Sequence, residues 1–290
     1  MSDIKLTEAQ QKNKDWWEDN PMTYDWQGTL TVEPGTREFY EAIDRRFFEA
    51  LRNFGHPNYP DQEPFSEIID FEWVKGKRVL EIGCGAGAHA MLLAKAGADL
   101  TAVDLTEQAI GLTRRRFEVF GLEGDIRQAD AEELPFEDDT FDLVWSWGVI
   151  HASANMQNAV DQIHRVLKPG GRTQVMVYHK NSARYWLLGG LVEGVLKGKL
   201  LQMPLHEVNK TFTDGAYALH LTARDARRMF KAFSKVETSI MDQGDQVEIP
   251  GYAFLSRNLL NRIIPRPAKV GFDVALQALW GWFLVIDAIK

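Results

Sequence analysis

Cysteine is almost absent from this sequence. Cys84 is the one cysteine in 290 residues, so the chain cannot form an intramolecular disulfide or a cysteine-rich zinc site. We expect no metal centre. A lone cysteine suits a reducing compartment, and residues 1–20 are polar and rich in charged residues, unlike a signal peptide. These features predict a cytoplasmic protein.

Basic residues are also in deficit. The chain has 33 Lys and Arg against 41 Asp and Glu, for a formal net charge of -8. A general nucleic-acid binder needs a basic surface, so we expect no nucleic-acid partner. With 45% hydrophobic and 26% charged residues, the composition is that of a folded globular protein and excludes disorder. The length allows one domain with sizeable additions.

An uninterrupted membrane-spanning run is missing as well. The apolar stretch at 270–289 contains Asp273, Gln277 and Asp287, which argues against a spanning helix. We predict instead an apolar C-terminal helix over 261–290. Burial against the sheet or pairing in a homodimer is favoured for it, and a peripheral contact with a membrane surface is the alternative.

The central part of the chain alternates short apolar runs with amphipathic stretches, which is typical of β–α–β units. We expect strands at 78–82, 99–104, 126–129, 141–147, 172–179 and 235–241, with helices at 87–96, 106–120, 157–167 and 222–233. The fold class predicted is α/β: a doubly wound, Rossmann-like, mostly parallel seven-stranded sheet.

Five regions follow from this pattern. We expect an N-terminal helical lid at 1–70, a nucleotide-type core at 71–180 and a cap insertion at 181–221. Residues 222–260 would return to the core, and 261–290 would form the C-terminal helix.

A glycine loop directly follows the first strand. Gly83, Gly85 and Gly87 would let the backbone turn tightly and approach a ligand at the start of the next helix. Asp104 ends the second strand and lies at the same edge of the sheet, where its carboxylate can accept hydrogen bonds from ribose hydroxyls. The spacing Gly83-x-Gly85-x-x-Ala88 also satisfies a dinucleotide-binding pattern, so these residues alone leave two cofactors open.

Five ordered motifs over 78–179 distinguish the two readings: EIGCGAG, VDLT, DAEELPF, FDLVWSWGVIH and VLKPGG. Together they resemble the class I S-adenosylmethionine-dependent methyltransferases, in the small-molecule branch that includes enzymes of ubiquinone and menaquinone biosynthesis. The resemblance implies S-adenosyl-L-methionine as cofactor, S-adenosyl-L-homocysteine as its product, and a small-molecule acceptor methylated by in-line displacement.

The resemblance also implies a set of cofactor-binding positions at the carboxyl ends of neighbouring strands. Those for the methionine and ribose parts are Glu81, Gly83, Gly85, Gly87 and Asp104. Those for the adenine and the sulfonium region are Leu105, Asp130, Ala131, Ser146 and Trp147.

Three histidines are candidates for a general base, which is required only if the acceptor carries a proton when it attacks. His151 follows the fourth strand, near the expected methyl group, and an imidazole with an ordinary pKa near ~6.5 suits proton transfer. His179 ends the fifth strand, and His220 lies in the cap insertion. A local structural role is the alternative for each.

The acceptor should be chosen by parts outside the core. In the lid, Tyr24 and Tyr40 are candidates to reach the acceptor, where aromatic rings can stabilise a cation. In the insertion, apolar and small residues predict an apolar pocket with Trp186 in its wall, and His151 would face it from the core. Packing alone would explain each of these aromatic side chains equally well.

Three functions follow. The first is methyl transfer from S-adenosylmethionine to a small, hydrophobic or amphipathic acceptor. The second is a nucleotide-dependent oxidoreductase, which depends on the glycine spacing and Asp104 alone. The third is a protein that binds S-adenosylmethionine without turnover and acts as a partner.

Overall fold

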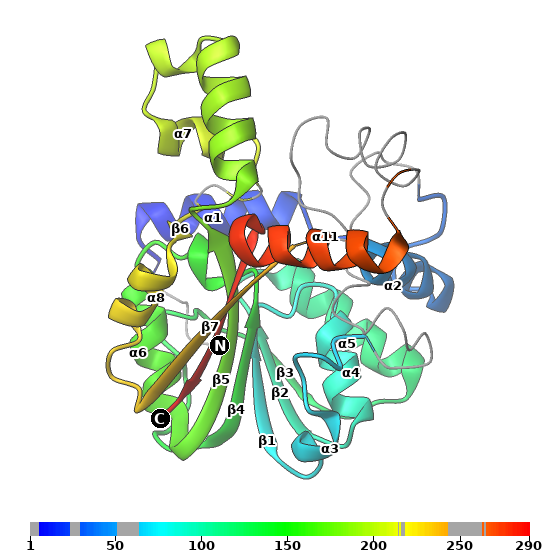
Figure 1. Cartoon of the computed structure of the whole chain (residues 1–290). Coiled ribbons are helices and arrows are strands. Elements are labelled where there is room, and N and C mark those ends of the chain that lie inside the picture. The colour runs from blue at the N-terminus through cyan, green and yellow to red at the C-terminus, as the bar shows by residue number, and fades with distance from the viewer. Residues whose placement is uncertain are drawn as a thin grey trace.

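A single mixed sheet organises the chain. The computed structural model describes residues 6–23, 30–50, 64–213, 215, 218–242, 263 and 265–290, apart from the side chains of 49, 50, 266, 267 and 270. The strands follow the order β3-β2-β1-β4-β5-β8-β7, and a short β6 pairs with β5 (Figure 1). The parallel strands are β1 (Arg78–Ile82), β2 (Asp99–Asp104), β3 (Asp125–Gln128), β4 (Phe141–Trp147), β5 (Leu167–His179) and β6 (His220–Leu221).

Strand order reverses at β1. The chain moves from β1 outward to β2 and β3 on one side, then returns to place β4 on the other side of β1. In open α/β sheets, ligands bind beyond the carboxyl ends of strands at such a reversal. The doubly wound, mostly parallel fold predicted from the sequence is therefore confirmed, and the topology marks where a ligand would bind.

The prediction of a helix over 261–290 is correct for the first part of this segment and wrong for its end. Helix α11 (Arg266–Trp280) ends at Gly281, and Phe283–Ile289 forms strand β8, inserted antiparallel between β5 and β7 (Lys235–Met241). Residues 282–286 are all buried, and a strand buried on both faces reads as a continuous apolar run, which periodicity cannot distinguish from a helix. Within the described ranges, no helix is both long and apolar enough to cross a bilayer.

Helices cover both faces of the sheet and create two apolar cores. One core receives side chains from α4 (Ala88–Lys95) and α5 (Glu107–Phe120), and the other from α6 (Met156–Val166) and α8 (Ala223–Met229). Two short helices complete this part, α3 (Phe71–Val74) before β1 and the 3-10 turn η2 (Ile150–Ala152) after β4.

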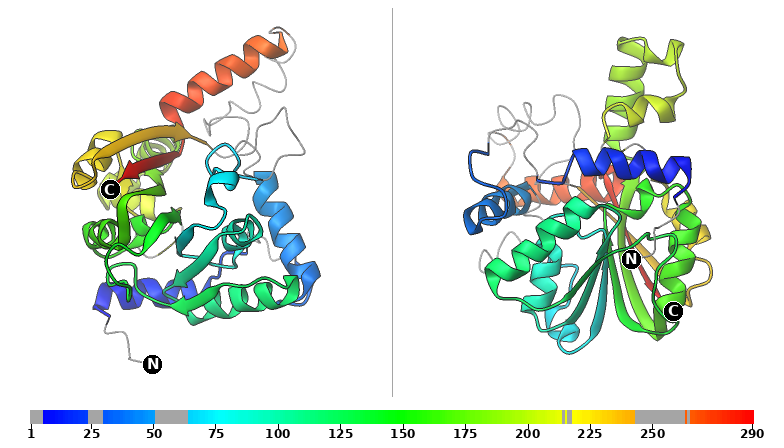
Figure 2. Two further views of the ribbon diagram at one scale, coloured as in Figure 1. Left: turned by 90° about the horizontal axis from the view of Figure 1, so that it is seen from below. Right: turned by 180° about the vertical axis from the view of Figure 1, so that it is seen from behind.

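The N-terminal region lies across the carboxyl end of the sheet. Helix α1 (Glu8–Asp19) begins with a capping box between Thr7 and Gln10, and it crosses the ends of the strands (Figure 2). Helix α2 (Arg37–Ala50) packs on α5 through an apolar cluster that includes Phe39, Tyr40 and Ile43. These helices cover the place where the strand order reverses.

The insertion after β5 projects away from the body (Figure 1). It consists of the π-helix η3 (Arg184–Leu196), the short turn η4 (Lys199–Leu201) and α7 (Leu205–Lys210). A Cβ at Gly189 would lie 2.3 Å from the Asn209 side chain, so the small residues of η3 allow α7 to pack closely against it. The insertion is thus a self-packed helical hairpin. The five regional boundaries expected above stay a prediction.

Candidate active site

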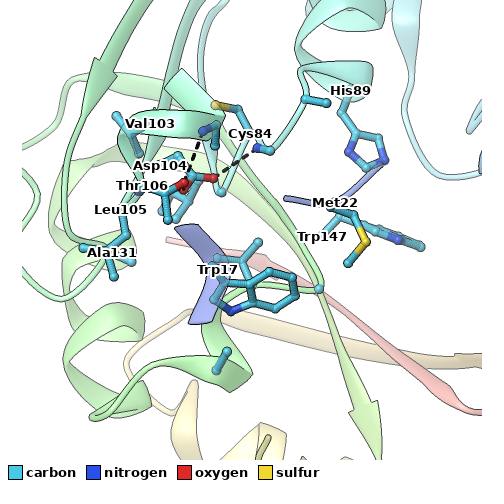
Figure 3. Close-up of a pocket in the computed structure, with 18 of the residues that line it drawn as sticks. Trp17, Met22, Cys84, His89, Val103, Asp104, Leu105, Thr106, Ala131 and Trp147 are labelled. Atoms are coloured by element: carbon cyan, nitrogen blue, oxygen red, sulfur yellow. Dashed lines mark hydrogen bonds between the residues drawn. The ribbon is translucent and has the colours of Figure 1, made fainter. Parts of the chain in front are cut away.

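A cavity of about 350 Å3 opens at the carboxyl ends of β1, β2, β4 and β5. Its wall combines the glycine loop, the ends of these strands and residues of α1 and α2 (Figure 3). Seven of the ten predicted cofactor-binding residues line it: Gly83, Gly85, Asp104, Leu105, Asp130, Ala131 and Trp147. Most of the predicted set therefore lies together, as expected for groups at the carboxyl ends of parallel strands.

Glycine is required for a different reason at each of the three positions in the loop. All have positive φ: 80° at Gly83, 53° at Gly85 and 79° at Gly87. A Cβ at Gly83 would fall 2.1 Å from Val149 Cγ2, and one at Gly87 would fall 3.0 Å from the Thr113 side chain. At Gly85 the nearest atom, Met22 Cβ, is 4.0 Å away. Gly85 thus leaves space in the cavity, whereas Gly87 lies outside the wall and serves helix packing.

Asp104 is fixed by three donors. Its Oδ2 accepts from the Gly85 amide at 3.1 Å, and its Oδ1 accepts from the Thr106 amide at 3.0 Å and the Thr106 hydroxyl at 2.9 Å. Burial raises the pKa of the Asp104 carboxyl, against the opposing effect of these hydrogen bonds. The carboxylate is therefore held rigidly at the cavity wall and gains from a hydrogen-bonding ligand (Figure 3).

Asp130 connects the core to the N-terminal helix. Gln10 Nε2 of α1 donates to Asp130 Oδ2 at 2.6 Å, and the Glu132 amide donates to Asp130 Oδ1 at 2.9 Å. Burial raises the pKa of Asp130. Because Gln10 and Asp130 both line the cavity, this bond closes α1 over it.

Glu81 lies behind the wall with one unsatisfied oxygen. Its side chain is 1% exposed, and its Oε1 lies 3.6 Å from His89 Nδ1. Among the described residues, neither Glu81 Oε2 nor His89 Nε2 has a hydrogen-bond partner. Burial raises the pKa of Glu81, since the ionised form loses its hydration. His89 itself lines the cavity, so the Glu81 carboxyl lies directly behind a wall residue.

A buried charge pair joins helices α2 and α5 near the cavity. Arg116 is completely buried and donates from both Nη atoms to Asp44 of α2 at 2.8–2.9 Å. The Tyr40 ring covers the guanidinium, with 4.6 Å from Cζ to the ring centroid. Arg116 and Asp44 both line the cavity. The pair joins α2 to α5 at the wall.

The opposite end of the cavity is aromatic. Trp147 of β4, Tyr178 of β5 and Phe283 of β8 line it, with Trp147 and Phe283 centroids 6.1 Å apart. Trp147 also stacks on Trp145, with ring centroids 5.4 Å apart and ring planes nearly parallel. Ser146 points to the other face of the sheet, where it is fully buried and its Oγ has no partner among the described residues. The structure therefore does not place Ser146 in the wall.

None of the three histidines lines the cavity. His151 is nearest: its ring centroid lies 4.1 Å from that of Tyr178, a wall residue. Burial lowers the pKa of His151 to about 3, with a smaller effect from His220, and burial lowers the pKa of His220 to about 4. His179 is buried with its Nδ1 3.1 Å from the Gly281 carbonyl oxygen. All three belong to a layer behind the wall.

Of the acceptor residues predicted from the lid and insertion, Tyr40 and Trp186 do not line the cavity. Tyr40 is fully buried and its hydroxyl donates to the Leu112 carbonyl at 2.7 Å, because its ring packs on Arg116. Trp186 is half-exposed on η3, which projects away from the site. Tyr24 lies outside the described residues.

Sequence reasoning missed several wall residues. They are Gln10, Trp17, Met22, Asp44, His89, Arg116, Tyr178 and Phe283. Tyr178 could have been found, because it lies at the carboxyl end of a predicted strand beside His179. The others depend on packing between distant segments, which no local pattern reveals.

S-adenosylmethionine fits this site. It is cationic at its sulfonium and amino group, and carboxylates lie at or just behind the wall at Glu81, Asp104 and Asp130. The unsatisfied Glu81 oxygen and the open space beside Gly85 mark the end that would take the amino-acid part. Asp104 and Asp130, at the ends of β2 and β3, would meet the hydroxyl and amino groups of the nucleoside.

Comparisons with known proteins agree with this site. A family profile described as a methyltransferase domain matches residues 80–175. A fatty-acid O-methyltransferase from Mycolicibacterium smegmatis is 42% identical over 100 residues, which is 34% of this chain and 36% of that protein. A ubiquinone biosynthesis O-methyltransferase from Aromatoleum aromaticum is 26% identical over 190 residues, 62% of this chain and 77% of that protein. The chain spans at most two fifths of the length of the first curated relatives it matches.

Structural similarity extends further along the chain than sequence similarity. A solved complex of the Haloferax volcanii Trm112 methyltransferase activator with a methyltransferase matches with a TM-score of 0.54 at 15% identity, covering 93% of this chain and 97% of that one. At this identity the match speaks for the fold alone. The profile match favours methyl transfer over the dinucleotide chemistry that the glycine spacing had left open.

Proposed function

Because residues 80–175 match a methyltransferase-domain profile, we propose that the chain is a class I S-adenosylmethionine-dependent methyltransferase that methylates a small hydrophobic or amphipathic acceptor. When bound, S-adenosylmethionine supplies an electrophilic methyl group on a sulfonium. The protein then has to bind, align and exclude water, so positioning supplies most of the rate enhancement. We place this activity in the cytoplasm, because a single buried free cysteine suits a reducing compartment.

One observation carries the proposal: the two ends of the cavity differ in chemistry along the strand order. Asp104 and Asp130 follow β2 and β3 on one side of β1, whereas Trp147, Tyr178 and Phe283 come from β4, β5 and β8 on the other. The acidic end suits a cationic nucleoside cofactor. The aromatic end suits an apolar acceptor. Their meeting point, beyond β1 and β4, is where the methyl group would pass.

The residues in the wall, and Glu81 behind it, would have distinct tasks. The carboxylates of Glu81, Asp104 and Asp130 would neutralise and orient the cofactor, and the Gln10–Asp130 bond would hold α1 closed so that water is excluded. Trp17 and Met22, from the N-terminal segment, border the cavity near Trp147 (Figure 3). Their apolar surfaces would cover the acceptor.

His151 is the proposed assisting residue for a protonated acceptor. Burial keeps its imidazole neutral at physiological pH but also makes it a much weaker base than an ordinary histidine, which favours a positioning role over full proton removal. Because Tyr178 separates it from the cavity, His151 would act through Tyr178 or by positioning it. For an amine that arrives deprotonated, neither residue is required.

Two experiments test the proposal. Calorimetry measures binding of S-adenosylmethionine, and a methyl-donor assay over lipid, quinone, phenol and amine acceptors identifies the products by mass spectrometry. We expect binding and one methylated product class. Asp104→Asn should weaken binding roughly tenfold or more, because a charge-assisted hydrogen bond is lost, while Asp99→Asn, at the exposed opposite end of β2, should not. Absence of S-adenosylmethionine binding would refute the function. Binding without any product would leave a non-catalytic partner protein.

A further inference from the structure

The projecting end of the insertion is apolar and unusually exposed. At the end of η3 the exposed fractions of the side chains are 60% at Val195 and 72% at Leu196, and at the end of η4 Leu201 is 92% exposed. We call residues 195–201 the insertion tip. Isolated exposed apolar side chains are ordinary, but these three lie within seven residues. They belong to the segment at the end of the projection (Figure 1), so apolar surface is concentrated there.

The tip is a preformed turn. Gly198 has a φ of 73°, its amide donates to the Val195 carbonyl at 3.1 Å, and the Leu201 amide donates to the Gly198 carbonyl at 3.1 Å. The Lys197 amide donates to the Val192 carbonyl at 3.0 Å. These three backbone donors are therefore satisfied within the insertion, which lowers the cost of placing the turn in an apolar environment.

Two lysines flank the apolar side chains. Lys197 and Lys199 both pair with Glu193, at 2.6 and 2.8 Å, which leaves a positive charge in excess. Residues 184–213 hold four Lys or Arg and two acidic residues, although the whole chain has a net charge of -8. The tip is thus locally basic on an acidic protein, and long lysine side chains can reach headgroups while leucines enter the acyl region.

From these observations we propose that the insertion tip docks on an anionic lipid bilayer. A convex tip of seven residues is too small for a stable protein interface, which buries about 800 Å2 on each partner, and a second copy would offer it the same positive charge. A bilayer accepts a convex apolar tip without a complementary groove. Because η3 follows the carboxyl end of β5, the docked tip would hold the active-site edge of the sheet toward the lipid. The proposal goes beyond methyl transfer and does not depend on it.

Sedimentation of the full chain with vesicles tests this contact. We expect binding to phosphatidylcholine vesicles that contain roughly one third phosphatidylglycerol, weaker binding to phosphatidylcholine alone, and loss of the difference at high salt. Leu201→Glu should weaken binding roughly tenfold or more, because a charge replaces an inserted apolar group. Trp73→Glu is the matched control: Trp73 is also exposed, but it precedes β1 at the opposite edge of the sheet.

Folding is checked by circular dichroism and thermal melting, and Leu201, being almost fully exposed, should tolerate the change. Failure of the wild type to bind anionic vesicles would overturn the proposal. So would equal binding by Leu201→Glu, or loss of binding in Leu279→Glu alone, which would transfer the contact to α11. A dimer in solution that Leu201→Glu dissociates, without vesicle binding, would identify a second copy as the occupant.

Discussion

Replacement of Glu81 by glutamine should raise the stability of the cofactor-free protein and lower its affinity for S-adenosylmethionine. Glu81 is 1% exposed, its Oε1 lies 3.6 Å from His89 Nδ1, and its Oε2 has no hydrogen-bond partner among the described residues. A carboxylate in this setting is costly to the folded protein and valuable to a cationic ligand. Glutamine keeps the volume and removes the charge.

Without cofactor, Glu81→Gln should stabilise the protein. The folded-state pKa of Glu81 is raised by burial, so its protonated form is favoured and its ionised form is penalised at neutral pH. Relief of an incompletely satisfied buried charge is worth about 1–2 kcal/mol. For a chain of this size, that corresponds to a rise in Tm of about 2–6 °C. The difference between variant and wild type should vanish below the unfolded-state pKa near ~4.5, where both side chains are neutral.

With cofactor, the sign should reverse. Removing one member of a buried charge pair costs about 2–5 kcal/mol of binding free energy, so affinity for S-adenosylmethionine should fall roughly thirtyfold or more. Saturating S-adenosylmethionine should therefore raise the Tm of the wild type more than that of the variant.

Differential scanning fluorimetry at several pH values and calorimetry measure both effects. Glu123→Gln, at an exposed glutamate in the loop before β3, is the matched control and should change neither quantity. A lower Tm of the cofactor-free Glu81→Gln protein would refute the burial argument. Unchanged affinity for S-adenosylmethionine would refute the role of Glu81 at the cofactor site.

Three further variants probe the surroundings of the cavity. Asp44→Asn should destabilise the protein by about 3–5 kcal/mol in urea unfolding, because it leaves the buried Arg116 charge unpaired; a loss below 1 kcal/mol would contradict this. Gln10→Ala should cost about 1.5–3 kcal/mol of α1 docking, seen as faster amide exchange in 8–19 and weaker cofactor binding; unchanged exchange would show that Asp130 does not hold the helix. His151→Gln should make the free energy of unfolding less dependent on pH in acid. The folded-state pKa of His151 is lowered to about 3, so its contribution to stability is present above pH ~6.5 and is lost as pH falls toward 3. A pH dependence of the urea midpoint between pH 4 and 6.5 that equals that of the wild type would contradict this.

Local patterns determined the parallel core and half of the site. The strands β1 to β5 were predictable because each is a short apolar run bounded by glycine, proline or a helix cap. Gly85, Asp104 and Asp130 were predictable as neighbours because the carboxyl ends of parallel strands meet at one edge, whatever the loops contain.

Tertiary structure decided what local patterns left undetermined. It turned Phe283–Ile289 into a strand, because a place between β5 and β7 buries both of its faces. It set the three histidines behind the wall and made Tyr178 the residue that meets the cavity. It also drew Gln10 to Asp130 and Asp44 to Arg116, pairs separated by 120 and 72 residues. The sequence alone determines which side chains are able to bind a cationic nucleoside, but contacts over such separations exist only once the sheet has brought the segments together.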